Sequence, residues 1–241
     1  AKMSADDWDL IYRVHMLGAH RVTAAAWPHL REQKYGRVIF TASAAGIYGN
    51  FGQANYSMAK LGVHGLAQTL ALEGKKKNVL VNTIAPIAGS RMTETVLPKD
   101  LIDALKPEYV TPLVAYLCHE SNEETGGLFE VGGGFMGKLR WERAAGKVFK
   151  LGRDITPDQV QKAFSEIMSF EKSTHPADVT SSSAPVRVSR SFVEGFADGA
   201  SLFFHELTST SRTGSSLPAA TFIDALASAY PAALASTTTG P

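Results

Sequence analysis

Two apolar runs decide the fold of this chain: Gly36-Arg-Val-Ile-Phe-Thr-Ala-Ser43 and Val79-Leu-Val-Asn-Thr-Ile-Ala-Pro86. A continuous apolar run of this length is typical of a parallel strand that is buried on both faces. Between the two runs, a glycine-punctuated loop over residues 46–52 leads into a helical pattern over about residues 53–74. A strand, a helix and a strand in this order predict a parallel pair joined by a right-handed crossover, and therefore an α/β fold.

Tyr56 and Lys60 stand four residues apart in the predicted helix, so both side chains leave from one face and can act on one bound molecule. A free tyrosine has a pKa of about 10, and a lysine ammonium one turn away would stabilise its phenolate. Ser43 ends the first strand, at the edge where open α/β sheets bind ligands, and would hydrogen-bond the same reacting oxygen. The arrangement suits acid/base chemistry. A Y-x-x-x-K pattern also occurs by chance in helices, as a half-buried tyrosine with a solvated lysine, but the strand context favours the first interpretation.

A serine, then Y-x-x-x-K, then a proline at the end of the next strand resembles the signature of the short-chain dehydrogenase/reductase family. Within that family the chain is similar to the (3R)-hydroxyacyl-CoA dehydrogenase units of the peroxisomal multifunctional enzymes of β-oxidation. The resemblance covers about residues 1–172 and implies the C-terminal part of a Rossmann-like, doubly wound parallel sheet. The runs that carry the closer match are residues 46–56, 88–93, 118–120, 126–131 and 139–143.

The resemblance implies a role for each matching residue. Tyr56 would be the general acid/base that moves a proton to or from the substrate oxygen, while hydride passes between carbon and the nicotinamide of NAD. Lys60 would hold the nicotinamide ribose hydroxyls and stabilise the phenolate, and Ser43 would orient the substrate. The substrate would be an acyl-CoA, and the chain would form a homodimer through its two long helices. The residues expected at the nicotinamide end and pyrophosphate are Ala88, Gly89, Ser90 and Arg91.

The chain departs from the wider family pattern at two places. Ile87 follows the proline where the family has glycine, and Arg91 stands where it has threonine, with Thr93 two residues further on. Which residue makes the contact of that threonine therefore stays open. His15 occupies the place of an asparagine that, in many family members, holds a water of the proton relay. A histidine there either holds the same water or is simply packed in the helix.

No glycine-rich turn of the T-G-x-x-x-G-x-G kind occurs in the 241 residues. Since pyrophosphate binds at such a turn, we expect that the chain lacks the N-terminal dinucleotide-binding half, so that the parent protein is catalytic and this chain alone is inactive. The choice of NAD over NADP follows from the resemblance only. Two alternatives stay open: a steroid or ketoacyl reductase of the same family, and a truncated, non-catalytic remnant that pairs with an intact subunit.

Other segments complete the predicted order of elements. A capping pair, Ser4 and Asp7, begins a helix that runs to about residue 32 with a kink at Pro28. Residues 93–105 form either a mobile cover over the substrate or a surface helix and loop. Residues 107–119 are expected to be helical and residues 127–131 to form a last short strand. A basic cluster over residues 138–153 either meets the phosphates of coenzyme A or is a solvated surface.

Composition changes near residue 172. Serine and threonine number 16 in residues 1–172 and 22 in residues 173–241. We therefore expect a partial catalytic domain over residues 1–150, a helical extension over residues 151–172 that starts with a cap at Thr156, and a linker or weakly structured tail over residues 173–241.

Charge and composition exclude several classes of protein. The 24 basic and 23 acidic residues give a net charge of +1, which offers no case for a nucleic-acid partner. No run approaches the roughly 18–20 apolar residues of a membrane span. The single Cys118 excludes an internal disulfide, and the scattered histidines predict no metal site. A peroxisomal location is implied by the resemblance alone.

Overall fold

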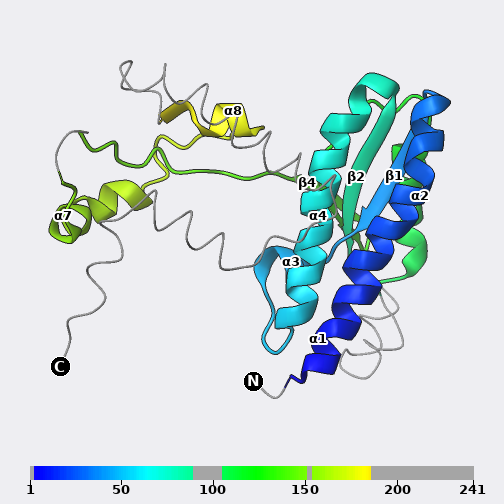
Figure 1. Ribbon diagram of the computed structural model, residues 1–241, viewed down its shortest axis with the longest axis horizontal. Coiled ribbons are helices and arrows are strands. Elements are labelled where there is room, and N and C mark those ends of the chain that lie inside the picture. Colours follow the sequence, from blue (N-terminus) through cyan, green and yellow to red (C-terminus); the bar gives the residue numbers. More distant parts are fainter. Residues whose placement is uncertain (1–2, 89–104, 151–153, 186–241) are drawn as a thin grey trace, which may run out of the picture. The chain divides into compact units, whose positions relative to one another are not determined.

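The computed structural model describes residues 3–88, 105–150 and 154–185 (Figure 1). The chain divides into two compact units, residues 1–142 and residues 143–241, and each is described by itself. The domain boundaries expected at residues 150 and 172 stay predictions. Residues 93–104, expected to form either a cover over the substrate or a surface helix and loop, lie outside the described residues, as does most of the predicted tail.

Unit 1 is built on a four-stranded sheet in the order β1 (Gly36–Thr41), β2 (Val79–Pro86), β3 (Leu128–Gly132) and β4 (Phe135–Leu139). β1 pairs with β2 and β2 with β3 in parallel, with Gly36 opposite Val79 and Thr83 opposite Leu128. This confirms the predicted parallel pair and the short strand predicted over residues 127–131, although that strand is not the last. β2 is buried along almost its whole length, as its apolar sequence indicates.

β4 was not predicted, because residues 127–131 were expected to form the last strand of the sheet. β4 instead folds back antiparallel onto β3, with Gly132 opposite Phe135. The two residues between them, Gly133 and Gly134, have positive φ of 55° and 84°, which glycine adopts without steric cost and which suits a two-residue hairpin.

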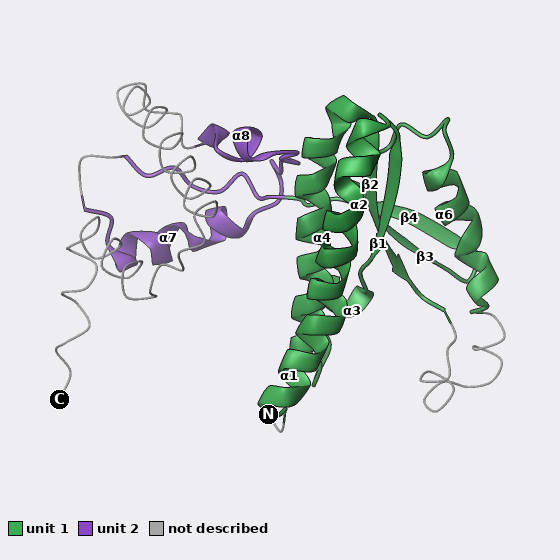
Figure 2. Ribbon diagram, turned by 45° about the vertical axis from the view of Figure 1, so that its right-hand side comes forward, with its two compact units in different colours: residues 1–142 green, residues 143–241 purple. Residues whose placement is uncertain are grey.

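Helices cover both faces of the sheet and make two separate cores. Figure 2 shows α4 (Ala54–Gly74) and α2 (Gly18–Glu32) on one side and α6 (Thr111–Cys118) on the other. The core under α4 and α2 is formed by Phe40, Val63, Ala67, Ala71, Val79 and Val81. The core under α6 is formed by Ile84, Leu117 and Val131, with Ile39, Leu113 and Phe129 packed against it. A sheet covered on both faces is the doubly wound arrangement that the sequence predicts.

The N-terminal helix is continuous but changes its hydrogen bonding along its length. It begins as α1 (Ala5–Ile11), passes through a π-helical turn (Tyr12–Leu17) and continues as α2, which contains Pro28. The predicted cap is confirmed: the Ser4 hydroxyl accepts from the backbone N–H of Asp7 at 3.1 Å, and the Asp7 carboxylate accepts from the Ser4 backbone N–H at 3.1 Å. The π turn was not predicted from the sequence.

Two connecting segments differ from the expected loop and helix. The loop after Ser43 contains a short helix, α3 (Ala44–Tyr48), before α4 begins as predicted. The helix expected over residues 107–119 is a 3-10 turn (Pro107–Tyr109) followed by α6.

Unit 2 contains α7 (Pro157–Met168) and α8 (Val179–Ser182). The cap predicted at Thr156 is confirmed, since its side chain accepts from the Gln159 N–H and the Gln159 side chain accepts from the Thr156 N–H. A single antiparallel bridge joins Arg143 to Thr174.

Candidate active site

The ammonium of Lys60 hydrogen-bonds to the end of β1. Its Nζ donates to the backbone carbonyl of Thr41 at 2.8 Å, and the residue is only 8% exposed. Burial lowers the pKa of Lys60 below its ordinary value of 10.5, because the charged form loses hydration. The contact joins α4 to the carboxyl edge of the sheet, where the sequence predicts a ligand site.

Tyr56 lies one turn before Lys60 on the same helix, and the Lys60 Nζ is 5.6 Å from the centroid of the Tyr56 ring. Tyr56 is half-buried, so its ring is held by neighbours while part of it meets solvent. The structure therefore brings together the phenol and the ammonium that the spacing in the sequence predicts on one face. The ammonium lies within the distance of a cation–π contact with the phenol ring.

Ser43 is the N-cap of α3, and its Oγ accepts from the backbone N–H of Ala45 at 3.2 Å. α3 packs directly against α4 at Gly46, where an added Cβ would lie 2.8 Å from the Leu61 nitrogen and 3.0 Å from the Lys60 Cβ. The lack of a side chain at Gly46 thus lets the helix that begins at Ser43 approach the helix that carries Tyr56.

His15, in the π turn, touches Tyr56 directly. The two rings meet edge to face, with centroids 5.3 Å apart and planes at 87°. Burial, and then the nearby charge of Lys60, lower the pKa of His15 below its ordinary value of 6.5. The sequence placed His15 near the site through the family pattern, but it did not predict this ring contact.

Asn55 was missed by the sequence reasoning. It is buried, its Nδ2 donates to the Asp7 carbonyl at 3.1 Å, and its Oδ1 accepts from the Tyr56 backbone N–H at 2.7 Å. Asn55 thereby joins the start of α4 to α1, one residue before Tyr56. An asparagine in the first turn of a helix was the signal available, since such residues often bond to nearby backbone.

The segment after β2 continues along the edge of β3. The Ile87 N–H donates to the Val131 carbonyl at 2.8 Å, and Gly132 allows this approach, because a Cβ there would lie 2.0 Å from the Ile87 oxygen. Ala88 follows directly. The other predicted cofactor residues, Gly89, Ser90 and Arg91, and the alternative Thr93, lie outside the described residues.

Comparison with known proteins identifies the family. The model of the family described as short chain dehydrogenase matches residues 1–100. The chain is 57% identical over 187 residues to peroxisomal multifunctional enzyme type 2 of Mus musculus. The match covers 77% of this chain and 25% of that protein. The match to the family model places residues 1–100 in the short-chain dehydrogenase family. Members of this family generally use NAD or NADP.

Two further relatives agree with this assignment. The chain is 55% identical over 175 residues to the peroxisomal hydratase-dehydrogenase-epimerase of Neurospora crassa, and the match covers 72% of this chain and 20% of that protein. The full-length peroxisomal multifunctional enzyme type 2 of Drosophila melanogaster matches in structure with a TM-score of 0.71 and 41% identity, over 77% of this chain and 34% of that one. The chain thus spans between a fifth and about a third of the length of these relatives. The structural match confirms the predicted Rossmann-like α/β fold.

Three residues of the basic cluster over residues 138–153 have partners within the protein. Lys138 pairs with Glu124 and Lys147 with Glu166, each at 2.9 Å, and Arg143 donates to the Ser182 carbonyl at 2.6 Å. For these three residues, the structure favours local surface contacts over the binding of coenzyme A phosphates.

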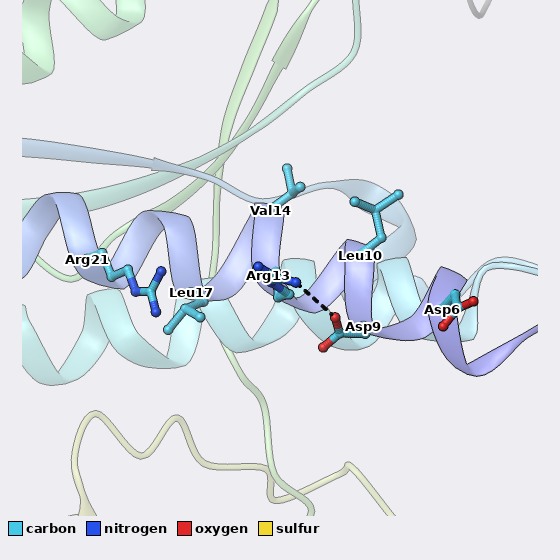
Figure 3. Close-up of a pocket in the computed structure, with 7 residues that line it drawn as sticks. All are labelled: Asp6, Asp9, Leu10, Arg13, Val14, Leu17 and Arg21. Atoms are coloured by element: carbon cyan, nitrogen blue, oxygen red, sulfur yellow. Dashed lines mark ion pairs between the residues drawn. The ribbon is translucent and has the colours of Figure 1, made fainter.

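Two surface hollows lie beside the N-terminal helix, and neither has Tyr56 or Lys60 among its lining residues. One, of about 480 Å³, is lined by α1, the π turn and α2, with Leu10 and Val14 beside an Asp9–Arg13 ion pair of 3.5 Å (Figure 3). The other, of about 640 Å³, lies between α1 and α4 and is largely apolar, with lining residues that include Trp8, Tyr12, Met16 and Met58.

The part of the chain that the structure describes contains no group of acidic, histidine or cysteine side chains able to hold a metal ion. Within the same residues, every helix is too short or too polar to cross a bilayer.

Proposed function

We propose that the protein carrying this chain oxidises a (3R)-3-hydroxyacyl-CoA to the 3-ketoacyl-CoA with NAD, in the peroxisome. The observation that carries the proposal is the Lys60 ammonium, buried against a strand carbonyl one helical turn from Tyr56. The identity of 57% to a mouse enzyme named peroxisomal multifunctional enzyme type 2 supports the substrate class and the location.

The residues of the chain divide the chemistry among them. NAD, when bound, supplies the acceptor for the hydride that leaves the hydroxyl-bearing carbon of the substrate. The Tyr56 phenolate takes the proton from the substrate hydroxyl, so that the C–H and O–H bonds break as the C=O bond forms. The Lys60 ammonium stabilises the phenolate in a site where burial weakens screening by water. Ser43 orients the substrate oxygen through its hydroxyl.

Lys60 is also the residue that fits the sugar of the nicotinamide. An ammonium has three N–H donors, and within the described residues the Thr41 carbonyl is the acceptor recorded for it. Two donors therefore remain for the ribose hydroxyls. Ala88, at the end of β2, would line the nicotinamide end, together with Gly89, Ser90 and Arg91.

Reduction of NAD by the full-length natural protein tests the proposal. Absorbance of NADH is followed with a (3R)-3-hydroxyacyl-CoA, with a steroid alcohol, and in reverse with a 3-ketoacyl thioester and NADPH. We expect turnover with the first substrate and a loss of about 10²- to 10⁴-fold in kcat for Tyr56→Phe, the range that a general acid/base contributes. Tyr116→Phe makes the same chemical change on exposed α6 and should leave kcat unchanged. No turnover of any hydroxyacyl-CoA, or a fully active Tyr56→Phe variant, would refute the proposal.

We also propose that the chain forms a homodimer through its long helices. Several large apolar side chains on α1, the π turn and α4 are exposed, among them Trp8, Leu10, Val14 and Met58. Of these, Trp8 and Met58 line the apolar hollow between α1 and α4. Light scattering of the full-length protein should give the mass of a dimer. Met58→Glu should lower that mass, whereas Tyr116→Glu, on α6, should not.

A further inference from the structure

The π turn interrupts the α-helical hydrogen bonding of the N-terminal helix, and it lies opposite Tyr56. At its end the Gly18 N–H bonds to the Arg13 carbonyl, five residues back. Such a turn holds one more residue than an α-helical turn, which changes the direction in which the enclosed side chains leave, and turns of this kind are frequent at functional sites. His15 is among the enclosed residues.

The His15 ring meets the Tyr56 ring in a geometry that favours attraction. Centroids 5.3 Å apart with planes at 87° put the edge of one ring against the face of the other, within the range of 4.5–7 Å in which aromatic pairs attract. The Lys60 Nζ lies 5.6 Å from the same Tyr56 ring. The phenol thus contacts both an aromatic ring and a cation.

The π turn is held against α4 on both sides of this contact. Before it, the Asn55 amide donates to the Asp7 carbonyl at 3.1 Å. After it, Met16 packs so tightly on Gly62 that a Cβ at Gly62 would lie 2.8 Å from the methionine methyl. Because both ties flank Tyr56 in the sequence of α4, the imidazole is held in place against the phenol.

We propose that His15 is a positioning residue for Tyr56: its imidazole ring packs on the phenol ring and holds the hydroxyl in the orientation that reacts. This inference rests on the proposed function. It assigns the role to the ring of His15 as a packing group and not to one of its nitrogens as a proton carrier. Lys60 favours a neutral ring, because an imidazolium would be repelled by the ammonium, and burial acts in the same direction.

Three substitutions of His15 in the full-length protein separate ring packing from nitrogen chemistry. His15→Phe keeps an aromatic ring, His15→Gln keeps a polar nitrogen, and His15→Ala keeps neither. We expect kcat to fall roughly 3- to 10-fold for the Ala and Gln variants, with KM little changed. This is the factor by which the loss of one aromatic pair would lower the population of the reactive Tyr56 orientation. The Phe variant should stay within about twofold of the parent. His20→Ala, at an exposed position on α2, is the matched control and should leave kcat unchanged.

A pattern in which Gln retains activity and Phe loses as much as Ala would overturn the inference, since a ring nitrogen would then be acting. An unchanged kcat in His15→Ala would overturn it as well.

A second measurement needs no turnover and so separates this inference from the proposed function. The NMR shifts of the His15 ring protons should carry the ring current of Tyr56. They should stay nearly unchanged in Tyr56→Phe, which keeps the aromatic ring, and move toward free-histidine values in Tyr56→Leu. Unmoved shifts in Tyr56→Leu would overturn the inference whatever the activity. If the His15 protons show the ring-current shift of Tyr56 but the protein has no dehydrogenase activity, the result would count against the proposed function alone.

Discussion

Replacing Gly46 by alanine tests how closely α3 must approach α4 for the site to form. The new Cβ would lie 2.8 Å from the Leu61 nitrogen and 3.0 Å from the Lys60 Cβ. The first of these atoms is helix backbone, which cannot turn away as a flexible side chain can. The two helices must therefore separate, and Ser43, the N-cap of α3, must move with its helix.

The size of the effect follows from two opposing contributions. Overpacking one methyl group against a buried surface costs about 1–3 kcal/mol. Alanine in place of glycine within a helix recovers about 0.5–1 kcal/mol. The net loss of up to about 2.5 kcal/mol lowers the unfolding midpoint by up to roughly 10 °C for a unit of this size. A shift of Ser43 by about 1 Å would lower kcat by as much as roughly 100-fold.

Thermal unfolding by circular dichroism, together with NADH absorbance of the full-length protein, measures both effects. Ala45→Gly is the matched control, because it changes one methyl in the same helix and costs about 0.5–1 kcal/mol without adding an atom against α4. Gly46→Ala should lower stability and kcat together, whereas Ala45→Gly should lower stability alone. A Gly46→Ala protein with the unfolding midpoint and kcat of the parent would refute the close-approach argument.

Three further predictions concern stability. Burial lowers the pKa of His64 below its ordinary value of 6.5, so the unfolded chain binds the proton first. Stability is therefore full above about pH 6.5 and falls toward pH 5, and His64→Gln should flatten this fall in the unfolding midpoint; equal slopes would contradict it. Asn82 is fully buried, accepts from the Gly127 N–H at 3.0 Å and donates to the Glu124 carbonyl at 2.7 Å. Asn82→Ala should therefore lower the free energy of unfolding, measured with urea, by about 2–4 kcal/mol. A loss below about 1 kcal/mol would argue against these bonds. Ser4→Ala removes a helix cap and should cost about 1 kcal/mol, measured in the same way; an unchanged midpoint would mean that the cap contributes nothing.

The sheet core could be predicted because its signals are local. The runs that became β1 and β2 are continuously apolar, and a glycine-rich loop and a long helix separate them, so element type and order follow from the sequence. The short helix α3 was missed, because a five-residue helix carries too little periodicity to be recognised between glycines. β4 was missed although the pair Gly133-Gly134 is a known hairpin signal.

The candidate site could be predicted in composition but not in its contacts. The spacing of Tyr56 and Lys60 fixes that both lie on one helix face. The partner of Lys60, by contrast, depends on where the end of β1 meets α4, and this is set by packing between distant segments. The π turn also depends on packing between distant segments. The spacing of apolar residues around His15 is that of an ordinary α-helix, whereas the contacts at Asn55 and Gly62 are tertiary.

The bond from Lys60 to the Thr41 carbonyl limits how this chain can vary in length. A one-residue insertion or deletion within β1 would reverse the direction in which the last carbonyl of the strand points and withdraw that acceptor from the ammonium. An insertion in α4 between Tyr56 and Lys60 would rotate one of the two by about 100° around the helix axis. Viable length variants among natural homologues are therefore expected outside these two elements.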